Sequence, residues 1–284
     1  YRSSCKQFIK FLEDEYRMKN LRNLNDKHIV AYINFRKLSG KSPKTLKNDL
    51  CAIRYLHDSL PNAKYELSDN MELQQKYKMK LDKTPNINGD RAWTKEEFQR
   101  FVKLSLEKMG SASRGTKTAA DALDIAILAK TMGLRITEAT AVSRAQAEQA
   151  LRNGIYQVQS EAKNGKWRKV RLSEEGKGVL NRRMAQTERG RRLFIRENEK
   201  THQAVNRMEK YLQNNREYFE TSLGQGERSS SGKTNNLTWH GLRYNYIQER
   251  MKEEIKNGFT KEQAAQIVTK EVGHERIGAI NIYY

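Results

Sequence analysis

Apolar residues three and four positions apart recur through most of this chain, and that helical spacing limits its possible folds more than any other feature. In the first eighty positions the spacing predicts helices over Phe8–Tyr16 and Ile29–Leu38, and a third that begins at Ser42-Pro43. Ser is favoured at the N-cap, and Pro suits the first helical position. The third helix should end before Pro61, and a weaker fourth should cover about residues 69–82. Together they predict a small all-α domain.

A linker and a strong helix start follow this region. Residues 84–90 (TPNINGD) have the composition of a linker. Thr94 and Glu97 then form a T-x-x-E capping box, with Trp93 and Phe98 in the positions of a hydrophobic staple. We therefore expect a helical domain over residues 1–83, a linker over 84–90 and a second domain over 91–284.

Strand-like alternation is confined to two neighbouring segments, Ile155–Gln159 and Trp167–Leu172. Between them lies Asn164-Gly165, a favoured two-residue hairpin turn because both residues tolerate positive φ. Two polar, Gly/Ser-rich segments, 110–118 and 221–236, are expected to be loops. The fold class is therefore mostly α (α+β), the second domain being mainly helical with one β-hairpin and at most a small sheet.

The charge of the chain points to a polyanionic partner. Lys and Arg number 54 against 34 Asp and Glu, which gives a formal net charge of +20, and both halves of the chain are basic. Nucleic acid or an acidic membrane face would explain this excess. No run of about 18 apolar residues exists, so we expect no membrane span. The chain opens at Tyr1 with no Met and no signal peptide, so we expect a fragment. The low cysteine count fits a cytoplasmic protein.

Two candidate functional segments carry an arginine and a lysine. Gly133 should end an apolar helix, which places Arg135 at a tight junction beside Glu138, where it could serve a site or simply cap carbonyls and pair with Glu138. Lys163 precedes the Asn164-Gly165 turn, and a hairpin tip can reach into a groove where a lysine donates a proton. The alternative is a solvated hairpin edge that also includes Lys166, Arg168, Lys169 and Arg171.

Two further segments carry histidines. His240 and Arg243 share a helix face just after Thr238, a plausible N-cap, and a helix N-terminus favours phosphate. A surface His/Arg pair is the alternative. Gly273 should end a helix capped by Thr260 and Gln263, exposing His274 shortly before Tyr283, although a tyrosine near a chain end is often a packing residue.

Several kinds of chemistry are disfavoured by the same sequence. Cys5 and Cys51 are too few and too far apart for a disulfide framework, and no histidine has zinc-ligand spacing. No phosphate-binding loop of the G-x-x-x-x-G-K-[ST] type exists. No paired acidic motif indicates a two-metal nuclease. We therefore expect neither a metal nor a cofactor.

Taken together, the four segments resemble the boxes of the tyrosine recombinase (phage integrase) family. Residues 133–138 (GLRITE) look like its first arginine box, 163–172 like its hairpin lysine segment, and 240–243 (HGLR) like its H-x-L-R box. The Gly273-His274 pair with Tyr283 nine residues after the histidine matches its G-H…Y spacing. The boxes span about half of the chain, and the basic helical region before them looks like the core-binding domain of the family.

The resemblance implies DNA strand exchange through a covalent 3′-phosphotyrosyl intermediate, without metal or ATP. Arg135, Arg243 and His274 would bind the non-bridging oxygens, which gain charge in the transition state. Tyr283 would be the nucleophile, with Tyr284 as the alternative because spacing alone distinguishes them. His240 would act as base, and Lys163 as the acid for the 5′-oxygen. Glu138 would support Arg135.

The implied partner is a double-stranded recombination site, bound by a homotetramer that joins two such sites. Lys41, Lys44 and Lys47 are the expected DNA-backbone contacts. Within enzymes, a type IB topoisomerase or a telomere resolvase would use the same residues. A DNA-binding protein that keeps only the fold is the alternative from another class.

Overall fold

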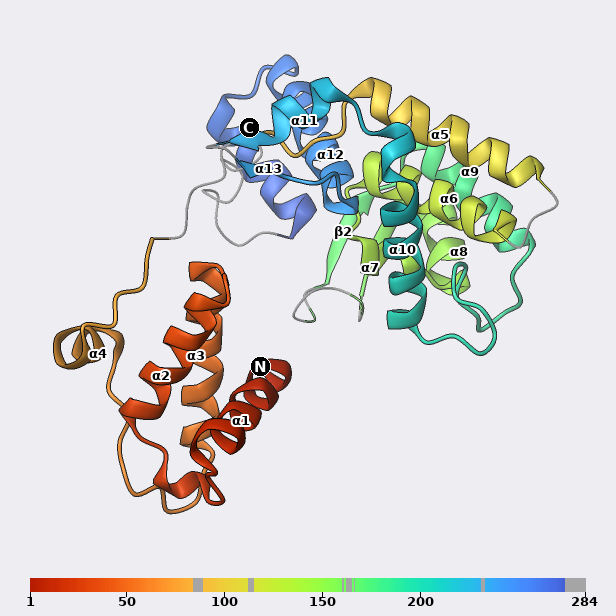
Figure 1. The fold of residues 1–284 in the computed structure, drawn as a ribbon. Coiled ribbons are helices and arrows are strands. Elements are labelled where there is room, and N and C mark those ends of the chain that lie inside the picture. Colours follow the sequence, from red (N-terminus) through yellow and green to blue (C-terminus); the bar gives the residue numbers. More distant parts are fainter. Residues whose placement is uncertain are drawn as a thin grey trace. The chain divides into compact units, whose positions relative to one another are not determined.

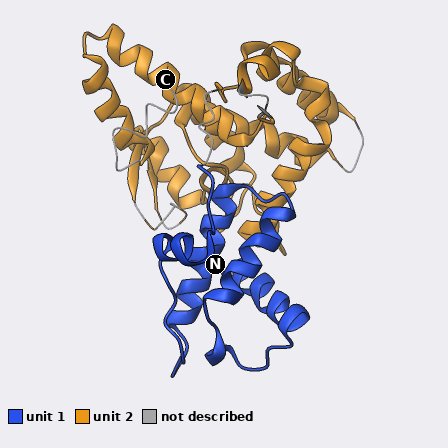
Figure 2. Cartoon of the chain, turned by 60° about the vertical axis from the view of Figure 1, so that its left-hand side comes forward, with its two compact units in different colours: residues 1–86 blue, residues 87–284 orange. Residues whose placement is uncertain are grey.

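The computed structural model describes residues 1–83, 89–111, 115–159, 161, 165, 167–230 and 233–273. The chain forms two compact units, residues 1–86 and 87–284, which are coloured separately in Figure 2.

The first unit is all-α. Its helices are α1 (Arg2–Tyr16), a 3-10 turn η1 (Leu21–Asn23), α2 (Asp26–Leu38), α3 (Pro43–Asp58) and α4 (Asn70–Tyr77). The apolar stripes predicted from the sequence form one core, whose fully buried members include Phe8, Leu12, Ile33 and Ile53. As expected, Ser42 is the N-cap of α3, and its hydroxyl accepts from the backbone N–H of Thr45. The helix expected near 69–82 is real but shorter.

The second unit is mainly helical (Figure 1), and its described residues form two small antiparallel sheets. Its helices are α5 (Lys95–Gly110), α6 (Thr116–Met132), α7 (Ile136–Thr140), α8 (Arg144–Asn153), α9 (Glu174–Ala185), α10 (Thr201–Phe219), α11 (Ser222–Arg228), α12 (Trp239–Lys256) and α13 (Lys261–Val272). Its strands are β1 (Ile155–Val158), β2 (Arg168–Arg171), β3 (Ser229–Ser230) and β4 (Lys233–Thr234). The predicted fold class is confirmed.

Helix α6 lies at the centre of this unit, and its neighbours determine where the candidate residues lie. It contacts α5, α9, α10 and α12, and most of its side chains are buried. Gly133 ends α6 in the left-handed conformation, at φ 62°, as predicted. The start of α5 also has the predicted capping box, because Thr94 N–H donates to Glu97 Oε2 (2.9 Å) and Glu97 N–H donates to Thr94 Oγ1 (3.1 Å).

The hairpin differs from its prediction in length. Strands β1 and β2 pair from Ile155–Arg171 to Val158–Arg168, so residues 159–167 connect them and not a two-residue turn. Gly165 has the expected positive φ, 66°, whereas Asn164 lies outside the described residues. The register explains the difference, because its midpoint is position 163 rather than the Asn164-Gly165 pair.

The loop expected over 221–236 is wrong in part. Thr221 caps α11, since its hydroxyl accepts from Gly224 N–H at 3.0 Å, and β3 and β4 follow. The physical reason is Arg228, which lies at the end of α11 and is fully buried against acidic partners. The loop expected over 110–118 is wrong at both ends, because α5 extends to Gly110 and α6 begins at Thr116.

No helix among the described residues has both the length and the apolar character that crossing a membrane requires.

Candidate active site

Glu138 is the central carboxylate of the candidate site. It is fully buried on the short helix α7, which begins three residues after the left-handed Gly133. Its oxygens accept from the backbone N–H (2.8 Å) and Nη1 (2.7 Å) of Arg135 and from Nη1 (2.8 Å) and Nη2 (2.6 Å) of Arg168. Burial raises the pKa of Glu138, but the hydrogen bonds and charges of Arg168 and then Arg135 lower it to about 2. The carboxylate is therefore ionised at neutral pH.

Arg243 is the third arginine at this centre. It is fully buried on α12, and its guanidinium donates to the backbone carbonyls of Gly133 and Val272, at the ends of α6 and α13. Its Nη1 lies 4.0 Å from Glu138 Oε2. Three guanidinium groups therefore surround one carboxylate, which leaves an excess of two positive charges for an anion to neutralise. The side chain of Arg135 is 19% exposed, so this arginine offers a route from solvent to the centre.

Arg168 is the residue that sequence reasoning missed. The sequence offers it only as a solvated side chain along the hairpin edge, and the structure contradicts this for Arg168, which is 8% exposed. Along β2 burial alternates, with Arg168 and Val170 inside and Lys169 and Arg171 outside. The same alternation in the sequence places Arg168 on the face of Val170, and this signal could have identified it.

His240 and Arg243 differ sharply in exposure although they are three residues apart on α12. Arg243 is buried, whereas His240 is exposed in the first turn, with its ring edge-on to that of Tyr244 at a centroid distance of 5.5 Å. Thr238 is the N-cap residue, as expected, but its side chain makes no capping bond. Its carbonyl instead accepts from Gly241 N–H (3.0 Å) and from Trp93 Nε1 (2.8 Å).

Two glycines in the boxes are required by close packing. A Cβ at Gly133 would lie 2.3 Å from the Tyr246 ring, in addition to the strain of its positive φ. A Cβ at Gly241 would lie 2.4 Å from the carbonyl oxygen of Arg91 and 2.6 Å from the ring of Trp93. Helix α12 can therefore approach the end of α6 and the Trp93 segment only because these positions have no side chain.

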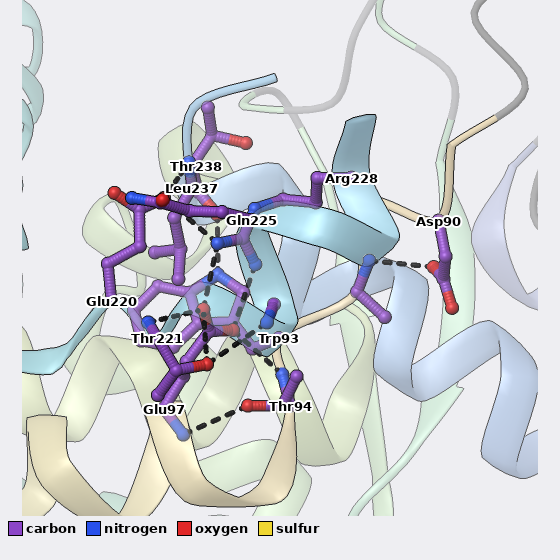
Figure 3. Close-up of polar contacts among 12 residues, drawn as sticks. Asp90, Trp93, Thr94, Glu97, Glu220, Thr221, Gln225, Arg228, Leu237 and Thr238 are labelled. Atoms are coloured by element: carbon purple, nitrogen blue, oxygen red, sulfur yellow. Dashed lines mark hydrogen bonds and ion pairs between the residues drawn. The ribbon is translucent and has the colours of Figure 1, made fainter. Parts of the chain in front are cut away.

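A second buried ion pair supports the segment that leads into α12 (Figure 3). Glu97 accepts from Arg228 Nη1 (2.9 Å) and Nη2 (2.8 Å), and Arg228 Nη2 also donates to Glu220 (2.9 Å). Thr221 N–H donates to Glu97 Oε1 at 3.2 Å. Glu97 belongs to the same capping turn as Trp93, and Trp93 Nε1 donates to the Thr238 carbonyl at the start of α12. The network therefore joins the starts of α5 and α12.

Known proteins resemble this chain in the sequence of its first unit and in its fold. Residues 1–64 match the phage integrase N-terminal SAM-like domain. The Tn1549 transposon integrase, solved in complex with transposon right end DNA, superposes with a TM-score of 0.56 at 15% identity, over 100% of this chain and 88% of that one. The XerH site-specific recombinase bound to palindromic difH, a post-cleavage complex, superposes with a TM-score of 0.54 at 16% identity. The match covers 98% of this chain and 72% of that one.

The chain has the tyrosine recombinase fold. The fold that the resemblance implies is thereby confirmed. A search of curated protein sequences found no match.

The described part of this recombinase fold brings together three of the residues predicted from the sequence, Arg135, Glu138 and Arg243. Lys163, His274, Tyr283 and Tyr284 lie outside the described residues. In the first unit, Lys41, Lys44 and Lys47 are exposed, the last two on α3 and Lys41 just before it. Within the described residues, no group of three or more His, Cys, Asp or Glu side chains could hold a metal ion.

Proposed function

We propose that this chain is a site-specific DNA recombinase that cuts and rejoins double-stranded DNA through a covalent 3′-phosphotyrosyl intermediate. The observation that carries the proposal is the buried cluster of Arg135, Arg168 and Arg243 around the single carboxylate of Glu138. Both neighbouring structures, the Tn1549 integrase and XerH, are complexes with DNA, which supports a DNA substrate.

The proposed chemistry begins with attack on the scissile phosphate. The phenolic oxygen of Tyr283, or of Tyr284 as the alternative, attacks phosphorus, and His240 takes the phenolic proton. The bond from phosphorus to the 5′-oxygen breaks, and Lys163 protonates the departing oxygen. The 3′-phosphotyrosyl bond keeps the energy of the phosphodiester, so a 5′-hydroxyl can reverse the step without ATP.

The arginines stabilise the charge that develops on the non-bridging oxygens. Arginine has five N–H donors in a rigid fork, which suits a phosphate better than a lysine point charge. Glu138 holds Nη1 of Arg135 at 2.7 Å, so this guanidinium is oriented before DNA arrives. We assign Arg135 and Arg243 to the phosphate, His274 as a further donor, and Glu138 as the support of Arg135.

We propose that residues 1–83 form a core-binding domain, 84–90 a linker and 91–284 the catalytic domain. Exposed Lys41, Lys44 and Lys47 contact the DNA backbone from the first domain. Strand exchange needs two duplexes, so we propose a homotetramer on two sites. The protein would act in the cytoplasm, associated with the nucleoid, as the recombinase of a phage or mobile element.

Covalent trapping on nicked DNA tests the proposal. The substrate is a duplex of the cognate site, found by selection from fragments around the gene, with a nick that lets the cleaved end diffuse away. We expect a protein–DNA adduct from the wild type and from Tyr284→Phe, but none from Tyr283→Phe. Loss only in Tyr284→Phe would move the nucleophile by one position.

The same assay separates the alternatives. An adduct accompanied by relaxation of supercoiled DNA, with no exchange between two sites, would identify a type IB topoisomerase. Formation of closed hairpin ends would identify a telomere resolvase. No adduct from the wild type on a site that it demonstrably binds would leave a DNA-binding protein without catalysis.

A further inference from the structure

Arg168 forms bonds with segments that lie far apart in the sequence. Both of its Nη atoms donate to the carboxylate of Glu138, 30 residues away on α7. Its Nε donates to the backbone carbonyl of Glu271 at 3.0 Å, 103 residues away near the end of α13. Its Cδ lies 3.0 Å from where a Cβ would stand at Gly273. One side chain thus joins the first arginine box, the hairpin and the end of the helix before His274.

The segment that Arg168 meets on α13 is itself held firmly. The carboxylate of Glu271 accepts from Tyr246 Oη (3.0 Å) and from Arg250 Nε (3.0 Å), both on α12. Burial, the charge of Glu271 and its hydrogen bond raise the pKa of Tyr246, so the phenol keeps its proton and remains a donor. The carbonyl to which Arg168 donates therefore has a fixed position relative to α12, the helix of Arg243.

The position of Arg168 in the hairpin gives these bonds a consequence. Arg168 pairs with Val158, and this is the last pair of the ladder before the connection 159–167. The strand pair that begins and ends this connection is therefore tied to Glu138 by two short charge-assisted bonds. Lys163, the proposed acid, lies within the connection.

We propose that Arg168 is a positioning residue that fixes the base of the 159–167 connection against the Arg135–Glu138 pair and the end of α13. This inference rests on the proposed function and deepens it, because it assigns the alignment of the acid with the phosphate-binding arginines to one side chain. Charge alone is insufficient for the role. A lysine could pair with Glu138, but it has one nitrogen where the planar guanidinium has three. It therefore cannot also donate to the Glu271 carbonyl.

The first test uses fluorescence and needs no DNA. Trp167 lies next to Arg168 and is 65% exposed, whereas Trp93 and Trp239, the other two tryptophans, are 2% exposed. Each variant is also made with Trp167→Phe, which leaves only the signal of the two buried tryptophans. The difference between the two time-resolved anisotropy decays then reports the nanosecond motion of Trp167, at the end of the connection. We expect larger fast-motion amplitude in Arg168→Lys and Arg168→Met. Arg171→Met is the matched control, since Arg171 is in the same strand but 69% exposed.

The second test measures single-turnover cleavage of two DNA substrates that differ in one atom. A sulfur in place of the 5′-bridging oxygen leaves as a thiolate and needs no proton, because a thiol has a pKa near 8.5. If Arg168 aligns the acid, Arg168→Lys should lower cleavage of the oxygen substrate by about 10²-fold and of the sulfur substrate by less than about 10-fold. Lys163→Met should show the same selective loss, and Arg171→Met should show none.

The outcomes are separable. Equal loss on both substrates would overturn the inference, because Arg168 would then only support the arginine centre. Unchanged anisotropy and unchanged cleavage would overturn it as well. If the wild type cleaves neither substrate, the proposed function fails. The anisotropy then still tests whether Arg168 fixes the connection, because unchanged motion overturns that role and increased motion supports it. Thermal unfolding of each variant shows whether it still folds. Arg168→Lys is the milder change because it keeps the positive charge.

Discussion

The buried Glu97–Arg228 pair makes a quantitative prediction about the stability of the second unit. Both side chains are at most 1% exposed, and Glu97 accepts both Nη atoms of Arg228 together with the N–H groups of Thr94 and Thr221. Glu97→Gln keeps the shape of the side chain but removes its charge, so Arg228 remains buried with Glu220 as its acidic partner at 2.9 Å.

Removing one partner of a buried ion pair costs about 3–5 kcal/mol. Each kcal/mol lowers the melting temperature of a unit of 150–250 residues by roughly 2–4 °C, so Glu97→Gln should lower that of the second unit by about 6–20 °C. The double variant Glu97→Met/Arg228→Met should lose less than the sum of Glu97→Met and Arg228→Met, because apolar groups then replace the whole pair.

Scanning calorimetry of the full chain, with the two units followed as separate transitions, provides the measurement. Glu96→Gln is the matched control, because Glu96 lies beside Glu97 in the same turn but is 55% exposed and pairs with Arg100 at 2.6 Å. Glu96→Gln should lower the free energy of unfolding by less than about 1 kcal/mol. A Glu97→Gln loss equal to that of Glu96→Gln, or a double variant equal to the sum of the singles, would refute the reasoning.

Three further predictions concern the site and the DNA surface. Glu138 has a pKa lowered to about 2 from 4.5, so its contribution to stability should be complete above pH 4.5 and decline towards pH 2, and the melting-temperature gap between wild type and Glu138→Gln should narrow over that range. Gly133→Ala should cost about 1–3 kcal/mol or more in chemical unfolding, because of its positive φ and the Tyr246 ring, and a loss below 0.5 kcal/mol would contradict this. Replacing Lys44 and Lys47 by Gln should reduce the slope of log K against log salt by about one each, with an unchanged slope showing that they make no phosphate contact.

Local features of this chain were readable from the sequence. The capping boxes Thr94–Glu97 and Thr260–Gln263 and the helix end at Gly133 all appear where expected. Each depends on residues within about three positions of one another, so the backbone bonds that they satisfy are the same in any tertiary context. The arginine boxes were equally legible because each is a short contiguous motif.

The tertiary structure decided which charged side chains are buried and with which partners. Arg168 and Arg228 stand in basic or polar stretches that look solvated, yet each meets a buried glutamate, 30 and 131 residues away respectively. Segment 221–236 became a helix and a short hairpin for the same reason. A buried charge is tolerated only where packing brings an opposite charge within hydrogen-bonding distance, and no local pattern in the sequence records that meeting.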